Sequence, residues 1–264
     1  MLTLFAATYQ RLTGPTYPET YLFENEGKTF KVRFPRSHGG SSDMRIRVPV
    51  DDQGVSGKLV YRRFPTNDLW DTVRMEQDEA FLVGYLPGQP PAGKLEYSIL
   101  LGPDGSEIQV NPNPVVLRFK GSVPAWVLIP HILFVFAAML FSSIAGFFAI
   151  FKHKVYRLYA YLTVIMIITG GLILGPVIQK FAFGAFWTGF PFGQDLTDNK
   201  ILIAFVFWLA AILGNIRKER RWMAILAACI YLVINIIPHS LLGSELDYES
   251  GEVMTGMVSL GIFF

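Results

Sequence analysis

The chain has 264 residues, of which 52% are hydrophobic and 17% are charged, and its formal net charge is +2. Soluble domains average about 25% charged residues, so this composition is typical of a membrane protein and argues against a soluble domain over the whole length. The small net charge argues against a nucleic-acid partner, and the single cysteine, Cys229, excludes an intrachain disulfide.

Residues 1–18 form the first segment, which begins with the apolar run MLTLFAA. This run has no basic residues before it and is shorter than the apolar core of a signal peptide. Two interpretations stay open. The segment is either the remnant of a spanning helix that starts upstream, or an apolar segment at the membrane interface.

Residues 19–121 contain short runs of β-branched and aromatic residues separated by turn sequences such as DDQG and GPDG. Runs at this spacing predict an antiparallel β-sandwich. The stretch EAFLVGYLPGQPPAGKLEYSILLGPDG resembles the strand and Pro-rich turn pattern of immunoglobulin-like and fibronectin type III-like domains, a resemblance that implies a fold and no activity. This region contains no complete catalytic grouping, and we interpret its one histidine, His38, as a turn residue. Docking to a partner protein is therefore its expected role.

Long apolar runs follow in residues 122–241, and a helix needs about 20 apolar residues to cross a membrane. The predicted fold class is therefore mixed, an N-terminal antiparallel β-sandwich plus a C-terminal four-helix transmembrane bundle. Gly171 and Gly175 have the spacing that lets helix backbones approach closely. The predicted spans cover residues 124–151, 156–178, 200–216 and 222–239, and residues 242–264 form a tail with a short apolar end.

The connections between spans predict the orientation, because basic residues in short loops stay on the cytoplasmic side. FKHKVYR joins the first and second spans, and GNIRKERRW joins the third and fourth. We therefore expect the N-terminal domain, the loop at 181–200 and the C-terminus to lie outside the cytoplasm of a bacterial inner membrane. The expected partners are the lipid bilayer and other membrane or periplasmic protein chains.

Two histidines, His131 and His239, each follow a proline near the outer ends of their predicted helices. Facing helices of a bundle can hold a b-type haem through two imidazole ligands. This pair makes haem b the candidate cofactor and the two histidines the candidate metal ligands. On the fourth span, Tyr231, Asn235 and His239 share one face. Such a polar stripe indicates either a functional site or hydrogen bonding between helices.

The loop FGAFWTGFPFGQDLTDNK weakly resembles the tryptophan-rich loop of the haem-handling proteins of cytochrome c biogenesis. In that resemblance Phe186, Trp187, Phe190 and Phe192 would form a face for a flat macrocycle between the two histidines. The loop departs from the pattern because it has one tryptophan, and because Gln194 precedes the aspartate. Aromatic residues are also common at membrane interfaces, which is the alternative interpretation.

Charged and amide side chains gather on the same predicted side. A helix that begins near DLTDNK can be capped by Asp195, Thr197, Asp198 or Asn199. Capping does not explain why the remaining charged side chains lie on the same side. These side chains could form a hydrogen-bonded network that holds the loop and the tail together, or a site for an anionic ligand or a proton. The set consists of Lys180, Asp195, Asp198, Asn199, Lys200, Glu245 and Asp247.

The whole chain resembles an uncharacterised family of bacterial inner-membrane proteins with an outer β domain, on the patterns GPxxQKxAFGxxWTG, TDNK and PHSL. The resemblance implies a topology and no activity. Three functions are considered. The first, favoured by the absence of a complete catalytic set, is a membrane subunit or assembly factor that docks a partner. The others are a haem or quinone site at the outer membrane face, for electron transfer or haem delivery, and a small transporter or receptor.

Overall fold

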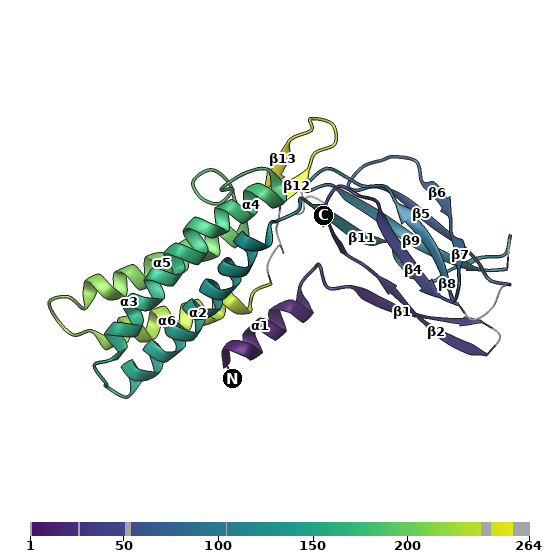
Figure 1. Ribbon diagram of the computed structural model, residues 1–264. Helices are drawn as coiled ribbons and strands as arrows, with labels where there is room; N and C mark the ends of the chain where they lie inside the picture. The colour runs from purple at the N-terminus through teal and green to yellow at the C-terminus, as the bar shows by residue number, and fades with distance from the viewer. Residues whose placement is uncertain (1, 26, 51–53, 104, 239–243, 256–264) are drawn as a thin grey trace. The chain divides into compact units, whose positions relative to one another are not determined.

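The computed structural model describes residues 2–25, 27–50, 54–103, 105–238 and 244–255. The chain divides into two compact units (Figure 1). The helical unit contains residues 1–15, 123–244 and 255–264. The β unit contains residues 16–122 and 245–254. The chain therefore passes from the β unit into the helical unit and returns to the β unit near its C-terminal end.

Within the described residues, the strands before residue 122 pair almost entirely antiparallel, which confirms the predicted N-terminal antiparallel sheets. One sheet has the order β3-β11-β9-β5-β6 with β10 beside β9, a second has the order β4-β8-β7, and β1 pairs with β2. The exception is β3, which runs parallel to β11 and contains His38, so the prediction of a turn at that residue is wrong. The strands are β1 (Glu19–Asn25), β2 (Lys28–Phe34), β3 (Ser37–Gly39), β4 (Met44–Pro49), β5 (Ser56–Arg63), β6 (Asp71–Arg74), β7 (Glu76–Asp78), β8 (Phe81–Leu86), β9 (Lys94–Gly102), β10 (Ile108–Gln109) and β11 (Val115–Lys120).

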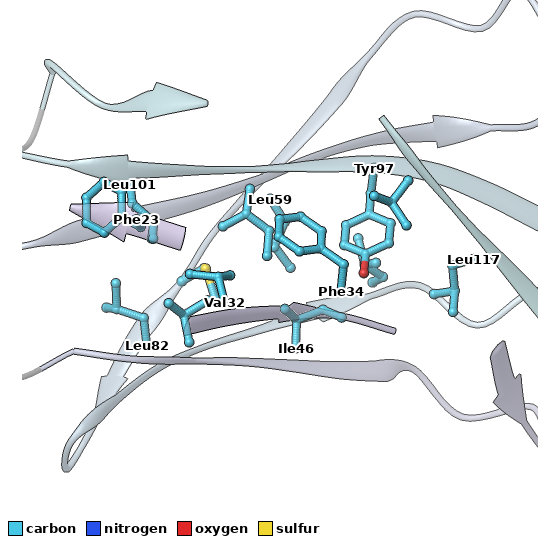
Figure 2. Close-up of a cluster of buried hydrophobic side chains, with 14 of the residues drawn as sticks. Phe23, Val32, Phe34, Ile46, Leu59, Leu82, Tyr97, Leu101 and Leu117 are labelled. Atoms are coloured by element: carbon cyan, nitrogen blue, oxygen red, sulfur yellow. The ribbon is translucent and has the colours of Figure 1, made fainter. Parts of the chain in front are cut away.

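One hydrophobic cluster joins these sheets (Figure 2). Successive side chains of a strand point to opposite faces, so β2 buries Val32 and Phe34 while their neighbours are exposed. The central strand β9 lies between β5 and β11 and is buried along most of its length. Its Tyr97 ring stacks on Phe34 at 5.8 Å between ring centroids. The sheets therefore share one core, while the sandwich arrangement stays a prediction.

The tail returns to the β unit as a hairpin of β12 (Ser244–Leu246) and β13 (Val253–Thr255). The backbone N–H of Leu246 donates to the carbonyl of Ala92 at 3.1 Å. Between the two strands, the Tyr248 hydroxyl donates to the Lys94 carbonyl and accepts from the Lys94 N–H, both at 2.9 Å. These bonds fasten the tail to the start of β9.

Among the described residues, three helical stretches are long and apolar enough to cross a membrane: Ala125–Ile150, Tyr156–Phe183 and Leu196–Gly214. The prediction of four spanning helices is therefore wrong by this measure. The fourth helix has only 16 residues, or about 24 Å at 1.5 Å per residue. Its end at Ile236 has a local cause, since Ile237 precedes Pro238 and is extended, as residues before proline tend to be. The helices are α1 (Leu2–Thr13), α2 (Ala125–Ile150), α3 (Tyr156–Met166), the π-helical η1 (Ile167–Leu174), α4 (Gly175–Phe183), α5 (Leu196–Gly214) and α6 (Arg221–Ile236).

Glycines let neighbouring helices approach η1 closely. A Cβ atom on Gly170 would lie 2.8 Å from the Cβ of Phe134 in α2, and one on Gly171 would lie 2.3 Å from the Cγ1 of Ile201 in α5. Both distances are too short for any larger residue without a shift of the backbone. Small residues drive helix packing in lipid for this reason. The segment η1 is thereby held between α2 and α5.

Candidate functional site

A cavity of about 170 Å³ lies inside the helical unit, at the end where α2 and α5 begin and where α4 and α6 end. Its walls are mostly apolar and several polar side chains converge on it, which is the usual make-up of a small-molecule site. Gln179 was not predicted as a site residue, although the GPxxQK pattern contains it. The polar residues that line the cavity are His131, Gln179, Asp195, Thr197, Asp198, Lys200, Tyr231 and Asn235.

The segment η1 sets the direction of the His131 ring. The Nδ1 atom of His131 lies 2.8 Å from the carbonyl oxygen of Gly170. A carbonyl can only accept, so Nδ1 carries the proton and Nε2 is left with a free lone pair. The same carbonyl accepts the backbone N–H of Gly175, five residues later in the π-helical pattern. Short π-helical segments are frequent at functional sites.

The DLTDNK sequence holds the preceding loop against the start of α5. Asp195 is the N-cap, and its carboxylate accepts the backbone N–H groups of Thr197 at 2.7 Å and Asp198 at 3.3 Å. Asp198 accepts the Thr188 N–H at 2.7 Å, and its Cβ would lie 2.5 Å from a Cβ placed on Gly189. Only glycine fits that approach.

The same loop is held by Asn199, whose side-chain oxygen accepts the Phe190 N–H at 2.7 Å. Gln179 donates from Nε2 to the Thr188 hydroxyl. The WTG and TDNK patterns therefore have a structural role, and Asp198 takes part in both the loop contacts and the cavity wall.

Lys200 is a buried cation, with only 5% of its surface exposed. Its ammonium group donates to the carbonyl of Ile237, just beyond α6, at 2.7 Å. The side-chain amide of Gln10 in α1 donates to the same carbonyl at 2.9 Å. An ammonium group has three donors, so Lys200 keeps capacity for a further acceptor.

Two polar atoms in the cavity wall have no hydrogen-bond partner among the described residues. They are the hydroxyl of Tyr231 and the Oε1 atom of Gln179. Tyr231 is 1% exposed and Gln179 is 8% exposed. The third member of the predicted stripe on this helix, His239, lies outside the described residues. Asn235 donates to the Tyr231 carbonyl of its own helix at 2.7 Å. Its side chain also lies beside the Tyr231 hydroxyl, but no hydrogen bond of acceptable geometry joins the two.

The loop aromatics do not line this cavity. Phe186, Phe190 and Phe192 are 57%, 68% and 83% exposed, and the indole N–H of Trp187 donates to the Phe190 carbonyl at 3.1 Å. Lys180 bonds the Gly184 carbonyl at 2.6 Å and lies over the Phe186 ring. These residues form a surface beside the cavity and not part of its lining.

The described cavity, of about 170 Å³, is smaller than the roughly 300–1,000 Å³ of pockets for drug-sized ligands. In the part of the chain that the structure describes, no group of three His, Cys, Asp or Glu side chains could hold a metal ion. The pairing of His131 with His239 stays a prediction. A visible spectrum of the haem-supplemented protein, with and without His131→Ala, would test it.

The two tail acids lie in the β unit and have their contacts there. Glu245 is buried and pairs with the Lys94 ammonium at 2.8 Å. Burial lowers the pKa of Lys94, and Glu245 opposes that shift. Asp247 accepts the N–H of Glu249 and the hydroxyl of Ser250, and these bonds lower the pKa of Asp247. The tail acids thus stabilise the hairpin, a role that sequence alone could not assign because Lys94 is about 150 residues away in the chain.

The known proteins offer no assignment for this site. No protein-family model matches the sequence, and no curated protein matches it at a significant level. Function must therefore be argued from the cavity itself.

Proposed function

We propose that this chain is an integral membrane protein that binds a small polar molecule in the cavity of its helical unit, as a receptor or transporter subunit does. The observation that carries the proposal is a pair of buried atoms with no hydrogen-bond partner among the described residues, the Tyr231 hydroxyl and Gln179 Oε1. An unpaired buried polar group costs about 1–3 kcal/mol. A ligand that pairs both atoms would recover that free energy on binding.

The chemistry of the wall narrows the ligand class. The hydroxyl of Tyr231 and the ammonium of Lys200 supply donors, while His131 Nε2 and Gln179 Oε1 supply acceptors. The volume of about 170 Å³ is close to the 150 Å³ of an apolar cavity that holds benzene. The proposed ligand is therefore about the size of a single ring and carries both an oxygen acceptor and a donor. A phenol, a small primary amide or a hydroquinone head group has these features.

The proposed topology places this cavity on the outer side of a bacterial inner membrane, because it lies at the end of the helices opposite the two basic loops. In that orientation the β unit, with a proposed Ig-like sandwich fold, lies outside the cytoplasm. It would dock a periplasmic or membrane partner that delivers or senses the ligand. The basic charge of the two loops supports the proposed orientation.

The test is ligand-induced thermal stabilisation of the full chain in mild detergent, with phenols, small primary amides and hydroquinones as probes. A ligand at a hundredfold excess over its Kd stabilises by about 2.7 kcal/mol. At least one probe class should raise the Tm of the natural chain and fail to raise that of Tyr231→Phe. Tyr9→Phe is the matched control, because Tyr9 in α1 is exposed and lies outside the cavity wall. An equal response from all three proteins, or no response to any class, would contradict the proposal.

A further inference from the structure

A second cavity, of about 150 Å³, lies at the opposite end of the helical unit. It is formed where α3 and α6 begin and where α5 ends. Polar and apolar surface are equally represented in its wall, unlike in the first cavity. Its principal lining residues are Tyr156, Arg157, Tyr161, Asn215 and Ile216.

This end of the helical unit is strongly basic. Residues 152–157 and 217–221 together contain seven Lys and Arg residues and one acid, Glu219, which pairs with Arg221. Two helices, α3 and α6, begin here with no acidic residue in the first turn and no capping side chain. A helix N-terminus carries a partial positive charge that favours an anion. The second cavity therefore lies in a positive field from both loops and both helix ends.

Two polar side chains of this cavity, Tyr156 and Asn215, are buried and bonded to each other, and the exposed Arg157 lies beside them. The Tyr156 hydroxyl donates to Asn215 Oδ1 at 2.8 Å, and the Arg157 Nε contacts the same hydroxyl at 3.5 Å. Asn215 Oδ1 also accepts the Arg220 N–H at 2.7 Å. Among the described residues, the terminal guanidinium nitrogens of Arg157 have no hydrogen-bond partner. Their planar pair of donors matches a phosphate group.

The surroundings of this cavity are apolar and exposed, which separates a lipid from a soluble anion. Leu158, Ile216 and Trp222 are 57%, 61% and 61% exposed, and Tyr161 is 50% exposed. Tryptophan and tyrosine are enriched at the level of lipid head groups. A ligand with its phosphate at Arg157 would place its remaining bulk along these side chains.

We propose that this second cavity binds the phosphate head group of an anionic phospholipid, with Arg157 as the principal contact and the exposed apolar residues around it contacting the acyl chains. Basic pockets between membrane helices on the cytoplasmic side are known to select such lipids. Retention of basic loops in the cytoplasm explains the net charge of this end. It does not explain why one arginine lies against a buried tyrosine at the wall of a cavity. This inference does not depend on the function proposed for the first cavity.

The test is native mass spectrometry of the delipidated full chain, titrated with phosphatidylglycerol or with phosphatidylcholine. The natural chain should retain more phosphatidylglycerol than phosphatidylcholine. Loss of one charge-assisted contact in Arg157→Gln should weaken phosphatidylglycerol binding about tenfold. Lys154→Gln is the matched control, since Lys154 is an exposed charge in the same loop and does not line the cavity. It should change binding by about twofold or less.

Three results would overturn the proposal. One is equal retention of the two lipids by the natural chain, a comparison that needs no variant to fold. Another is an equal effect of Arg157→Gln and Lys154→Gln, which would indicate a diffuse charge effect. The third is full displacement of phosphatidylglycerol by inorganic phosphate, which would make a soluble anion the ligand. Arg157→Lys, which keeps the charge, should retain most of the binding and shows that the cavity folds.

Discussion

The β unit pairs its buried tyrosine hydroxyl, while one end of the helical unit leaves an equally buried one unpaired. In the β unit, the hydroxyl of Tyr97 donates to the Pro35 carbonyl at 2.9 Å. In the helical unit, Tyr231 is 1% exposed and its hydroxyl has no partner among the described residues. Folding alone favours paired groups, because an unpaired one destabilises the native state. The contrast holds for these two hydroxyls and not for the whole interiors, because the Nε atom of Arg36 in the β unit also lacks a partner among the described residues.

The same contrast separates the two ends of the helical unit. At the basic end, Asn215 bonds Tyr156, the Ala211 carbonyl and the Arg220 backbone, so protein groups satisfy one another. At the cavity end, Asn235 bonds only the carbonyl of Tyr231 in its own helix. At the basic end the buried Tyr156 hydroxyl is paired, although a cavity lies beside it. At the other end the buried Tyr231 hydroxyl has no partner among the described residues.

The largest expected effect comes from the two asparagines. Asn215→Leu leaves the Tyr156 hydroxyl and the Arg220 N–H unpaired, and we expect it to lower the free energy of unfolding by about 3 kcal/mol. Asn235→Leu removes one local bond and should cost about 0.6 kcal/mol, the average for a polar bond in a membrane protein. Denaturant unfolding of the full chain in detergent would measure both. Equal costs would show that Asn235 has a larger structural role than its single bond indicates.

A smaller effect is expected at Tyr97 in the β unit. Tyr97→Phe removes the bond to Pro35 and leaves a partly buried carbonyl without its donor, so it should destabilise the β unit by about 1 kcal/mol. Hydrogen exchange of the β9 amides in the full chain would report the loss. Unchanged or increased protection there would weaken the contrast between the two units.

The smallest expected effect is a dependence on pH in the β unit. Bonds from Lys58, at 2.7 Å, and from nearby backbone N–H groups lower the pKa of Glu107 from 4.5 to about 2. A lowered pKa in the folded state stabilises fully above pH 4.5, and that contribution is lost as the pH falls towards 2. Glu107→Gln should flatten the pH dependence of the Tm in this window. Glu76→Gln, at an exposed position on β7, is the control and should leave the slope unchanged.

The fold was predictable from sequence where periodicity is strong. Alternating apolar residues predicted the antiparallel sheets, but the short β3 was missed because SHG has no apolar pattern of its own. Long apolar runs marked the helices, yet the fourth was predicted too long because the effect of Pro238 on Ile237 was not taken into account. The π-helical turn at Gly170 depends on contacts with α2 and α5, which composition does not reveal.

The candidate site was predictable in part, because polar residues within apolar helices often mark functional sites. His131, Lys200 and Tyr231 were identified in this way, and the structure places them around one cavity. Gln179 was missed because an amide near a helix end is ordinary in sequence. Its importance rests on an unpaired oxygen that only three-dimensional packing reveals.

The most direct test of the cavity as a ligand site compares Tyr231→Phe with Tyr156→Phe in the absence of any added ligand. Removal of an unpaired buried hydroxyl should stabilise the chain by about 1 kcal/mol, whereas removal of the paired Tyr156 hydroxyl should destabilise it by about 1 kcal/mol. Thermal unfolding of the two variants beside the natural chain should therefore give shifts in Tm of opposite sign. If Tyr231→Phe lowers the Tm as much as Tyr156→Phe, the Tyr231 hydroxyl is paired within the protein and the account of an open cavity is contradicted.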